Sequence, residues 1–140
     1  MNPQMAAALA AEEAAIYAYG ALGVKLTGTG ERTEARAAEA AHRDRRDVLV
    51  TRLAALKASE APAPAGYQLP FEITDRESAL KLAIQVEDGV AQAWRAVLPV
   101  TEGDDRATAL SALIDSAVRA TRWRRLGAVT PATLAWPGRA

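Results

Sequence analysis

Five side chains of this sequence could together bind a transition metal ion. They are four carboxylates and the single histidine of the chain: Glu12, Glu39, His42, Glu87 and Asp115. Each lies on or beside a stripe of apolar residues that recur every three or four positions, which is the spacing of one helix face. A charge in such a stripe is costly unless it is paired or bound to a metal. The sequence therefore predicts that each of these groups has a partner.

The pattern of these residues is that of a carboxylate-bridged metal site with one half incomplete. Di-iron and di-manganese sites in helical bundles use a Glu from each of two helices and a Glu-x-x-His from each of the other two. Glu39 and His42 complete one such motif, whereas Asp115 and Val118 stand where the second would lie. Without a second imidazole we expect weak metal affinity, and neither iron storage nor di-iron oxidase activity.

A second interpretation of the same residues needs no metal. An arginine fork can neutralise buried carboxylates such as Glu12 and Glu87, and Arg46 and Arg122 are candidates. The Glu-x-x-His pair also suits an ordinary hydrogen bond between helix turns. Both interpretations stay open at this point. Four aromatic side chains at helical spacing are interpreted as packing groups rather than a redox chain: Tyr17, Tyr19, Trp94 and Trp123.

Four helices must position these residues. The apolar stripes and the end signals predict helices over 3–28, 32–58, 75–98 and 104–126. Asn2 is the expected N-cap of the first helix, and Thr74 with Glu77 forms the expected capping box of the third. Gly127 ends the fourth. The inner face of the fourth helix is expected to carry a stripe of larger apolar residues: Leu110, Leu113, Ile114, Ala117, Val118 and Thr121.

The connections between the helices predict the topology. Short links join the first helix to the second and the third to the fourth, so each pair forms an antiparallel hairpin. Residues 59–75 could extend about 56 Å at about 3.3 Å per residue, which exceeds the roughly 37 Å length of a 25-residue helix. The fold class is therefore all-α, a ferritin-like four-helix bundle of two antiparallel hairpins joined by a long crossover. The bundle occupies 1–126, and the tail 127–140 should dock, with Trp136 as its natural anchor.

Composition excludes several classes of function. Lys plus Arg and Asp plus Glu each number 17, so no net charge attracts nucleic acid or a membrane surface. Cysteine is absent, which removes thiol catalysis, disulfides and iron–sulfur clusters. With one histidine, a hydrolytic triad also has little support, so no catalytic residue is assigned. The N-terminus resembles no secretory signal, which predicts a cytoplasmic location.

Several longer strings resemble a known family. They are Ala-Glu-Glu-Ala-Ala-Ile-Tyr-Ala-Tyr-Gly at 11–20, Ala-His-Arg-Asp-Arg-Arg-Asp at 41–47, Leu-Pro-Phe at 69–71 before Thr74-Asp75, and Ala-Thr-Arg-Trp-Arg at 120–124. The chain is similar over nearly its whole length to DUF4439, an actinobacterial family of ferritin-like domains. That resemblance implies the ferritin-like fold and no established activity.

Two functions follow from these observations. The leading interpretation is a non-catalytic bundle with a degenerate metal site and no cofactor, acting as an interaction module and forming a homodimer. The 34 alanines support close helix contacts, and the tryptophan of the tail could bury surface against a second subunit. The alternative is a reduced iron or manganese site, held by the five side chains named first, that reacts with oxygen or peroxide.

Overall fold

The computed structural model describes residues 3–58 and 67–139. Four α-helices and two short 3₁₀ segments follow in order: α1 Pro3–Leu22, η1 Gly23–Lys25, α2 Thr29–Ala55, α3 Arg76–Val97, η2 Leu98–Val100 and α4 Gly103–Leu126. The prediction of an all-α four-helix bundle is confirmed. Within the described ranges, no helix is long and apolar enough to cross a membrane.

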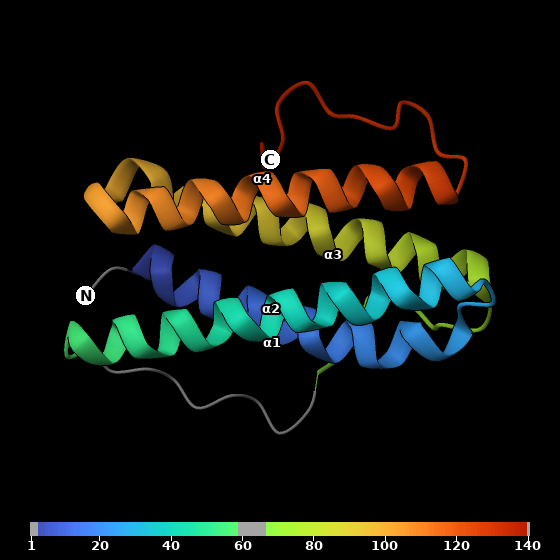
Figure 1. The fold of residues 1–140 in the computed structure, drawn as a ribbon, viewed down its shortest axis with the longest axis horizontal. Helices are drawn as coiled ribbons and strands as arrows, with labels where there is room; N and C mark the ends of the chain where they lie inside the picture. Colours follow the sequence, from blue (N-terminus) through green and yellow to red (C-terminus); the bar gives the residue numbers. More distant parts are fainter. Residues whose placement is uncertain (1–2, 59–66, 140) are drawn as a thin grey trace.

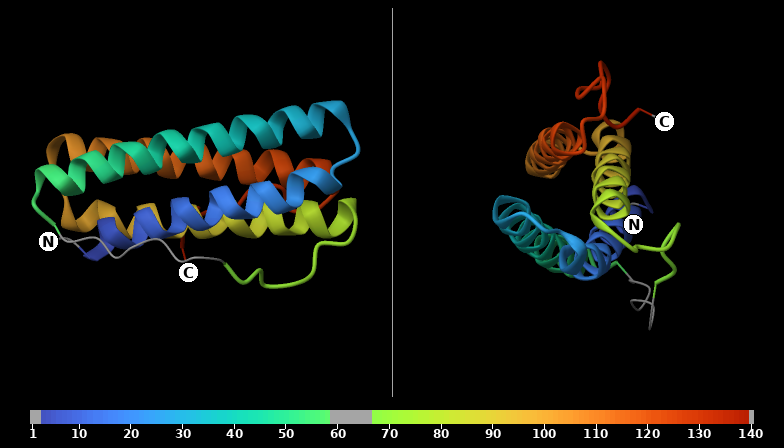
Figure 2. Two further views of the ribbon diagram at one scale, coloured as in Figure 1. Left: turned by 90° about the horizontal axis from the view of Figure 1, so that it is seen from below. Right: turned by 90° about the vertical axis from the view of Figure 1, so that its right-hand side faces the viewer.

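The helices form two antiparallel hairpins that lie side by side (Figure 1). One hairpin is α1 with α2, and the other is α3 with α4. Because α2 ends and α3 begins at opposite ends of the bundle, the connection between them must travel its whole length (Figures 1 and 2). The centre of the molecule is the contact between α1 and α3, which joins the two hairpins.

Local hydrogen bonds place the helix ends slightly differently from the prediction. The carboxylate of Glu31 accepts the backbone N–H of Gly28 at 3.2 Å, so α2 begins at Thr29 rather than at 32. The cap of α3 is Asp75 rather than Thr74, and its carboxylate accepts the backbone N–H of Ser78 at 2.9 Å. Helix α1 stops at Leu22, before the predicted 28. The expected cap at Asn2 lies outside the described residues.

The described half of the crossover packs against the bundle, as its apolar residues predict. Leu69, Phe71 and Ile73 are partly buried against the core formed by the ends of α1 and α3. The ring of Tyr67 also lies against that of Tyr17, with the ring centroids 5.1 Å apart and the ring planes tilted by 39°. This segment therefore covers the outer edge between α1 and α3.

The apolar core consists of two clusters separated along the bundle axis. One contains Leu9, Leu49 and Trp94, and the other contains Leu22 and Trp123. The residues between them in every helix include polar groups that are fully buried. The core is thus divided by a polar layer, which is described below.

Helix α4 turns a different face to the core from the one predicted. Its buried residues are mostly small or polar: Ala109, Ala112, Ser116, Arg119, Ala120, Trp123 and Arg124. Leu110, Ile114 and Val118 of the predicted inner stripe are 47%, 54% and 45% exposed. Among the described residues, Trp94 of α3 and Trp123 of α4 itself are the largest fully buried side chains, and they fill the volume that further bulky residues of α4 would need. The prediction was therefore wrong for these three residues, whereas Leu113 of the same stripe is partly buried and packs against the core.

The side of the bundle between α2 and α4 is held by ion pairs. Viewed along the axis, the helices form an arc in the order α2, α1, α3, α4, and its two ends face each other (Figure 2). We call this side the α2–α4 seam. It is crossed by Arg45–Asp115 at 2.7 Å, Arg52–Asp105 at 2.8 Å, Arg119–Glu34 at 3.6 Å and Arg122–Glu34 at 3.4 Å.

The tail after Gly127 folds back over the hairpin of α3 and α4 (Figure 1). Arg95 of α3 donates a hydrogen bond to the carbonyl of Pro137 at 3.0 Å. Gly138 has a φ of 77°, and a Cβ there would lie 2.7 Å from the carbonyl oxygen of Ala91. The side chain of Trp136 is 64% exposed, so it is not the anchor of the tail on its own bundle.

Candidate functional site

Three polar side chains form the centre of the buried layer. Glu12 of α1, His42 of α2 and Glu87 of α3 are all completely buried. The imidazole of His42 lies between the two carboxylates, with Nδ1 2.5 Å from Oε2 of Glu12 and Nε2 2.9 Å from Oε2 of Glu87. His42 of α2 therefore bridges two acidic side chains: Glu12 of α1, in the same hairpin, and Glu87 of α3, in the other hairpin.

Aromatic donors extend this bridge into a continuous hydrogen-bond chain. The indole N–H of Trp94 donates to Oε1 of Glu12 at 2.7 Å. At the other end, the hydroxyl of Tyr19 donates to Glu87, and the indole N–H of Trp123 donates to that hydroxyl at 2.8 Å. The chain thus begins on α3, passes through α1, α2, α3 and α1 again, and ends on α4.

The charges of this layer follow from its hydrogen bonds. Burial alone would lower the pKa of His42, but hydrogen bonds to Glu12 and Glu87 and their negative charges raise it to about 9. The ring is therefore an imidazolium at neutral pH, and both of its N–H groups donate. Burial, reinforced by the charge of Glu87, raises the pKa of Tyr19 well above its ordinary value, so the phenol stays protonated.

Helix α4 completes the layer with Ser116 and Arg119, three residues apart. Ser116 is completely buried, and Arg119 is nearly so. Arg119 donates to Asp115 at 2.8 Å. Burial alone would lower the pKa of this guanidinium, but the charge of Glu87 and the hydrogen bond to Asp115 raise it. Among the residues that the structure describes, four buried side-chain atoms have no hydrogen-bond partner: Oε1 of Glu87, Oγ of Ser116, Nε of Arg119 and Nη1 of Arg45.

Two of the five residues singled out from the sequence lie away from this layer. Glu39 is partly exposed and pairs with Arg43 one turn later, at 2.9 Å. Asp115 lies in the α2–α4 seam and accepts from both Arg45 and Arg119. Burial alone would raise the pKa of Asp115, but these two hydrogen bonds outweigh it and lower the pKa. The structure therefore brings together Glu12, His42 and Glu87 only.

The comparisons with known proteins agree with this architecture. The family model described as "Domain of unknown function (DUF4439)" matches residues 4–140. The chain belongs to the DUF4439 family. Among solved structures, a conserved hypothetical protein, rv2844, from Mycobacterium tuberculosis is 41% identical to this DUF4439 chain, with a TM-score of 0.84. The match covers 89% of this chain and 95% of that one. The search of curated proteins gave no match.

The polar layer of this DUF4439 chain does not fit a metal ion as it is arranged. A histidine binds a metal through a nitrogen lone pair, and both nitrogens of His42 face carboxylates instead. Across residues 3–58 and 67–139, no group of three or more His, Cys, Asp or Glu side chains is placed to hold a metal ion. The positive charge between Glu12 and Glu87 is supplied by the imidazolium itself.

The arginine interpretation is also corrected. Arg46 pairs with its neighbour Asp47, and Arg122 reaches Glu34, so neither contacts Glu12 or Glu87. Sequence reasoning missed Arg119, because α4 was assigned the wrong inner face. It also treated Trp94 and Trp123 as packing groups only. Their role as donors could have been found from a general requirement, since a buried indole N–H needs an acceptor and buried carboxylates need donors.

Proposed function

We propose that this chain is a non-catalytic, ferritin-like interaction module that forms a homodimer through the outer face of α4. The observation that carries this proposal is that α4 exposes a line of large apolar side chains to solvent. Apart from Trp123 near its end, this helix packs with small or polar residues, and it exposes Leu110, Ile114 and Val118.

The interior supports the non-catalytic half of the proposal. A catalytic site needs groups that can reach a substrate and change partners during the reaction. Glu12, His42 and Glu87 are fully buried and already hydrogen-bonded to one another. Two antiparallel hairpins with a long crossover, together with a buried Glu, His and Glu on α1, α2 and α3, are the traits that support a ferritin-like origin.

The exposed stripe supports a second copy of this chain as the partner. Leu110, Ile114 and Val118 follow one another at four-residue intervals, so they form a line about 12 Å long on one face of α4. Such a line is symmetric about Ile114. Two copies related by a two-fold axis through that residue would place Leu110 of each against Val118 of the other. The zero net charge of the chain adds no overall repulsion between copies.

The test is the mass of the protein in solution. Light scattering of the intact chain at micromolar concentration should give a dimer, and Ile114→Glu should give a monomer, because a charge at the centre of an apolar interface is left unpaired. Thr51→Glu, at an exposed position on α2, is the matched control and should remain dimeric. A monomeric mass for the intact chain, or a dimer that Ile114→Glu leaves unchanged, rejects the α4 interface.

A separate experiment tests the non-catalytic half. Protein purified without a histidine tag after growth in iron, and then in manganese, should contain far less than one metal ion per chain by elemental analysis. Two irons per chain, with an oxygen-dependent absorbance change that His42→Ala abolishes, would overturn the proposal.

A further inference from the structure

The exposed stripe of α4 is too small to hold two chains together by itself. Leu110, Ile114 and Val118 are each only about half exposed. A stable protein–protein interface buries about 800 Å² on each partner and involves roughly 20–30 residues a side. The homodimer proposed above must therefore bury further apolar surface beside this stripe. Two features of the chain can supply it: the tail, and a cavity at the α2–α4 seam.

The tail presents a tryptophan to solvent from a fixed backbone. Trp136 is 64% exposed, although the residues that follow it are held against α3. The carbonyl of Pro137 accepts a hydrogen bond from Arg95 at 3.0 Å, and Gly138 lies so close to the backbone of Ala91 that a Cβ would not fit. Large aromatic side chains presented in this way are typical of residues that dominate protein–protein contacts.

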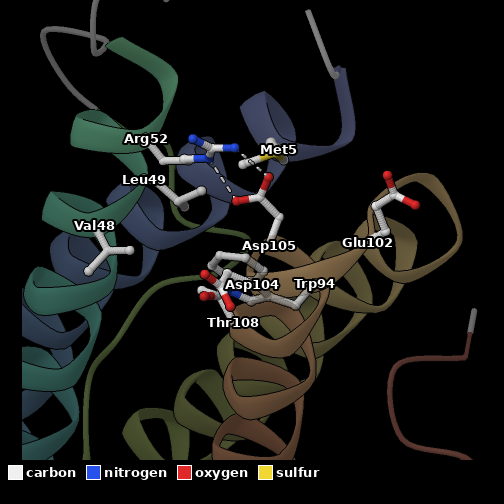
Figure 3. Close-up of a pocket in the computed structure, with 9 residues that line it drawn as sticks. All are labelled: Met5, Val48, Leu49, Arg52, Trp94, Glu102, Asp104, Asp105 and Thr108. Atoms are coloured by element: carbon white, nitrogen blue, oxygen red, sulfur yellow. Dashed lines mark hydrogen bonds and ion pairs between the residues drawn. The ribbon is translucent and has the colours of Figure 1, made fainter. Parts of the chain in front are cut away.

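The cavity lies at the end of the α2–α4 seam where α4 begins (Figure 3). Its inner wall is apolar, because Met5, Leu49 and Trp94 belong to one of the two core clusters. The indole N–H of Trp94 already donates to Glu12, so this ring offers apolar surface. Val48 of α2 lies at the mouth and is 53% exposed. The volume of about 410 Å³ is in the range of small-molecule sites, about 300–1,000 Å³, and is large enough for an indole ring.

The two-fold axis of the proposed dimer brings the tail of one chain to the cavity side of the other. In one chain the tail lies along the α3 side of α4, where Leu134 and Pro137 line a groove with Ala91 and Ala117. The cavity opens on the other side of α4, between α4 and α2. A half-turn about an axis through Ile114, perpendicular to the helix, reverses the helix and exchanges its two sides. The α3 side of one α4 therefore lies beside the α2 side of the other.

Ion pairs within the chain fix the height of Trp136 along α4. Asp88 of α3 pairs with Arg124 of α4. Arg95, which holds the tail, lies two turns further along α3. Because α3 and α4 are antiparallel, Arg95 is near the level of Ala117. Trp136, next to the residue that Arg95 binds, is therefore also near this level.

The mouth of the cavity lies at the matching height on the partner. Val48 is located between the two arginines of α2 whose ion pairs cross the seam at 2.7 and 2.8 Å, which puts it near the level of Ser111. A two-fold axis through Ile114 exchanges a position three residues after it with one three residues before it. Ala117 of one chain thus meets Ser111 of the other. Trp136 of one chain is therefore level with Val48 of its partner.

From this geometry we propose that Trp136 of each chain inserts into the cavity of the other. The inference rests on the homodimer through α4 and adds a second contact to it. Each indole packs against Met5, Leu49 and Trp94 of the partner and removes up to about 150–250 Å² of its own surface from water. The occupant is a second copy, because the tail and the cavity of one chain lie on opposite sides of α4.

Sedimentation equilibrium of the full chain measures the contribution of this contact. Trp136→Ala should raise the dissociation constant of the dimer by about tenfold or more. Val24→Ala is the control, because Val24 is 78% exposed at the end of the bundle away from the cavity, and it should leave the constant unchanged. An unchanged constant in Trp136→Ala overturns the insertion and leaves the α4 dimer standing. A monomeric intact chain overturns both.

Filling the cavity should have the same effect as removing the tryptophan. Val48→Trp places an indole at the mouth and should also raise the dissociation constant by about tenfold or more. Since both variants remove the same contact, Trp136→Ala combined with Val48→Trp should bind no more weakly than either variant alone. Losses that add in the double variant would show that the two residues act at separate places, and would refute the assignment.

Nuclear magnetic resonance tests the contact directly. In a mixed sample of isotope-labelled and unlabelled chains, nuclear Overhauser effects that cross between chains should connect the ring protons of Trp136 with the methyl groups of Met5 and Leu49. Their absence in a sample that sediments as a dimer rejects the insertion.

Discussion

The stability of this protein should fall steeply between pH 6.5 and pH 9 because of one buried histidine. His42 has a pKa of about 9 in the folded chain, against 6.5 for an ordinary histidine. A group whose pKa is raised on folding stabilises the folded state fully below its unfolded pKa and loses that contribution as the pH rises through the folded pKa. At about 1.4 kcal/mol per pH unit, the interval between the two pKa values corresponds to about 3 kcal/mol.

The assay is urea denaturation followed by far-ultraviolet circular dichroism at half-unit steps from pH 6 to pH 10. We expect the free energy of unfolding of the wild type to decrease by about 3 kcal/mol over this range, with a maximum slope near one proton per molecule. His42 is the only histidine of the chain, so no other side chain with an ordinary pKa near 6.5 contributes.

His42→Gln is the control for this prediction. The amide cannot become a cation, so the variant should be less stable at pH 6.5, by about 3–5 kcal/mol when a buried charge loses its partner. Its stability should then be nearly constant between pH 6.5 and pH 9. A wild-type curve that changes by less than about 1 kcal/mol, or a variant with the same slope as the wild type, would refute the bridged imidazolium.

Three further predictions concern single side chains. Ser116→Ala should leave the protein as stable or raise its free energy of unfolding by about 1–2 kcal/mol, because no described residue forms a hydrogen bond with the buried hydroxyl. Ser111→Ala, at an exposed position of the same helix, measures the gain of about 0.5 kcal/mol from helix propensity alone, and a net loss of stability at Ser116 would contradict the reasoning. Gly138→Ala should release the tail from α3, because the added Cβ would collide with the backbone of α3 and the φ of this residue is positive. We expect faster amide hydrogen exchange after residue 127 with little change in Tm. Unaltered exchange rates in the tail would count against this prediction. Glu31→Gln should lower the free energy of unfolding by about 1–2 kcal/mol at pH values above 4.5, the ordinary pKa of the carboxylate, since the hydrogen bond from Arg76 holds the pKa of Glu31 below that value. The difference in free energy between variant and wild type should shrink as the pH falls below 4.5.

The sequence predicted the helices well because their signals are local. The apolar stripes, the caps and the long link between α2 and α3 depend on neighbouring residues and on length, so the bundle and its two hairpins could be derived. The same stripes placed Glu12, His42 and Glu87 inside. Glu39 differs because Arg43 one turn later offers an exposed partner, which costs less than burial.

The inner face of α4 could not be derived from its sequence. An alanine-rich helix has apolar residues on most of its circumference, so periodicity does not say which of them face the core. The choice depends on the volume already filled by Trp94 and Trp123 from α3 and α4. Because α4 presents a different face from the one predicted, Asp115 lies in the α2–α4 seam and Arg119 is buried. The position of the His42 imidazolium between Glu12 and Glu87 likewise could not be predicted, because it depends on the distances between three helices.

We expect the α2–α4 seam to be the side of the bundle whose stability depends most on salt. The opposite side, where α1 meets α3, is packed with apolar side chains whose contact does not depend on salt. The seam depends on arginine–carboxylate pairs with partly exposed side chains, and such pairs are screened within about 3 Å in 1 M salt. The two hairpins are thus joined by apolar packing along α1 and α3 and by ion pairs along α2 and α4. We therefore expect high ionic strength to weaken the ion pairs of the α2–α4 seam while the apolar contact between α1 and α3 persists.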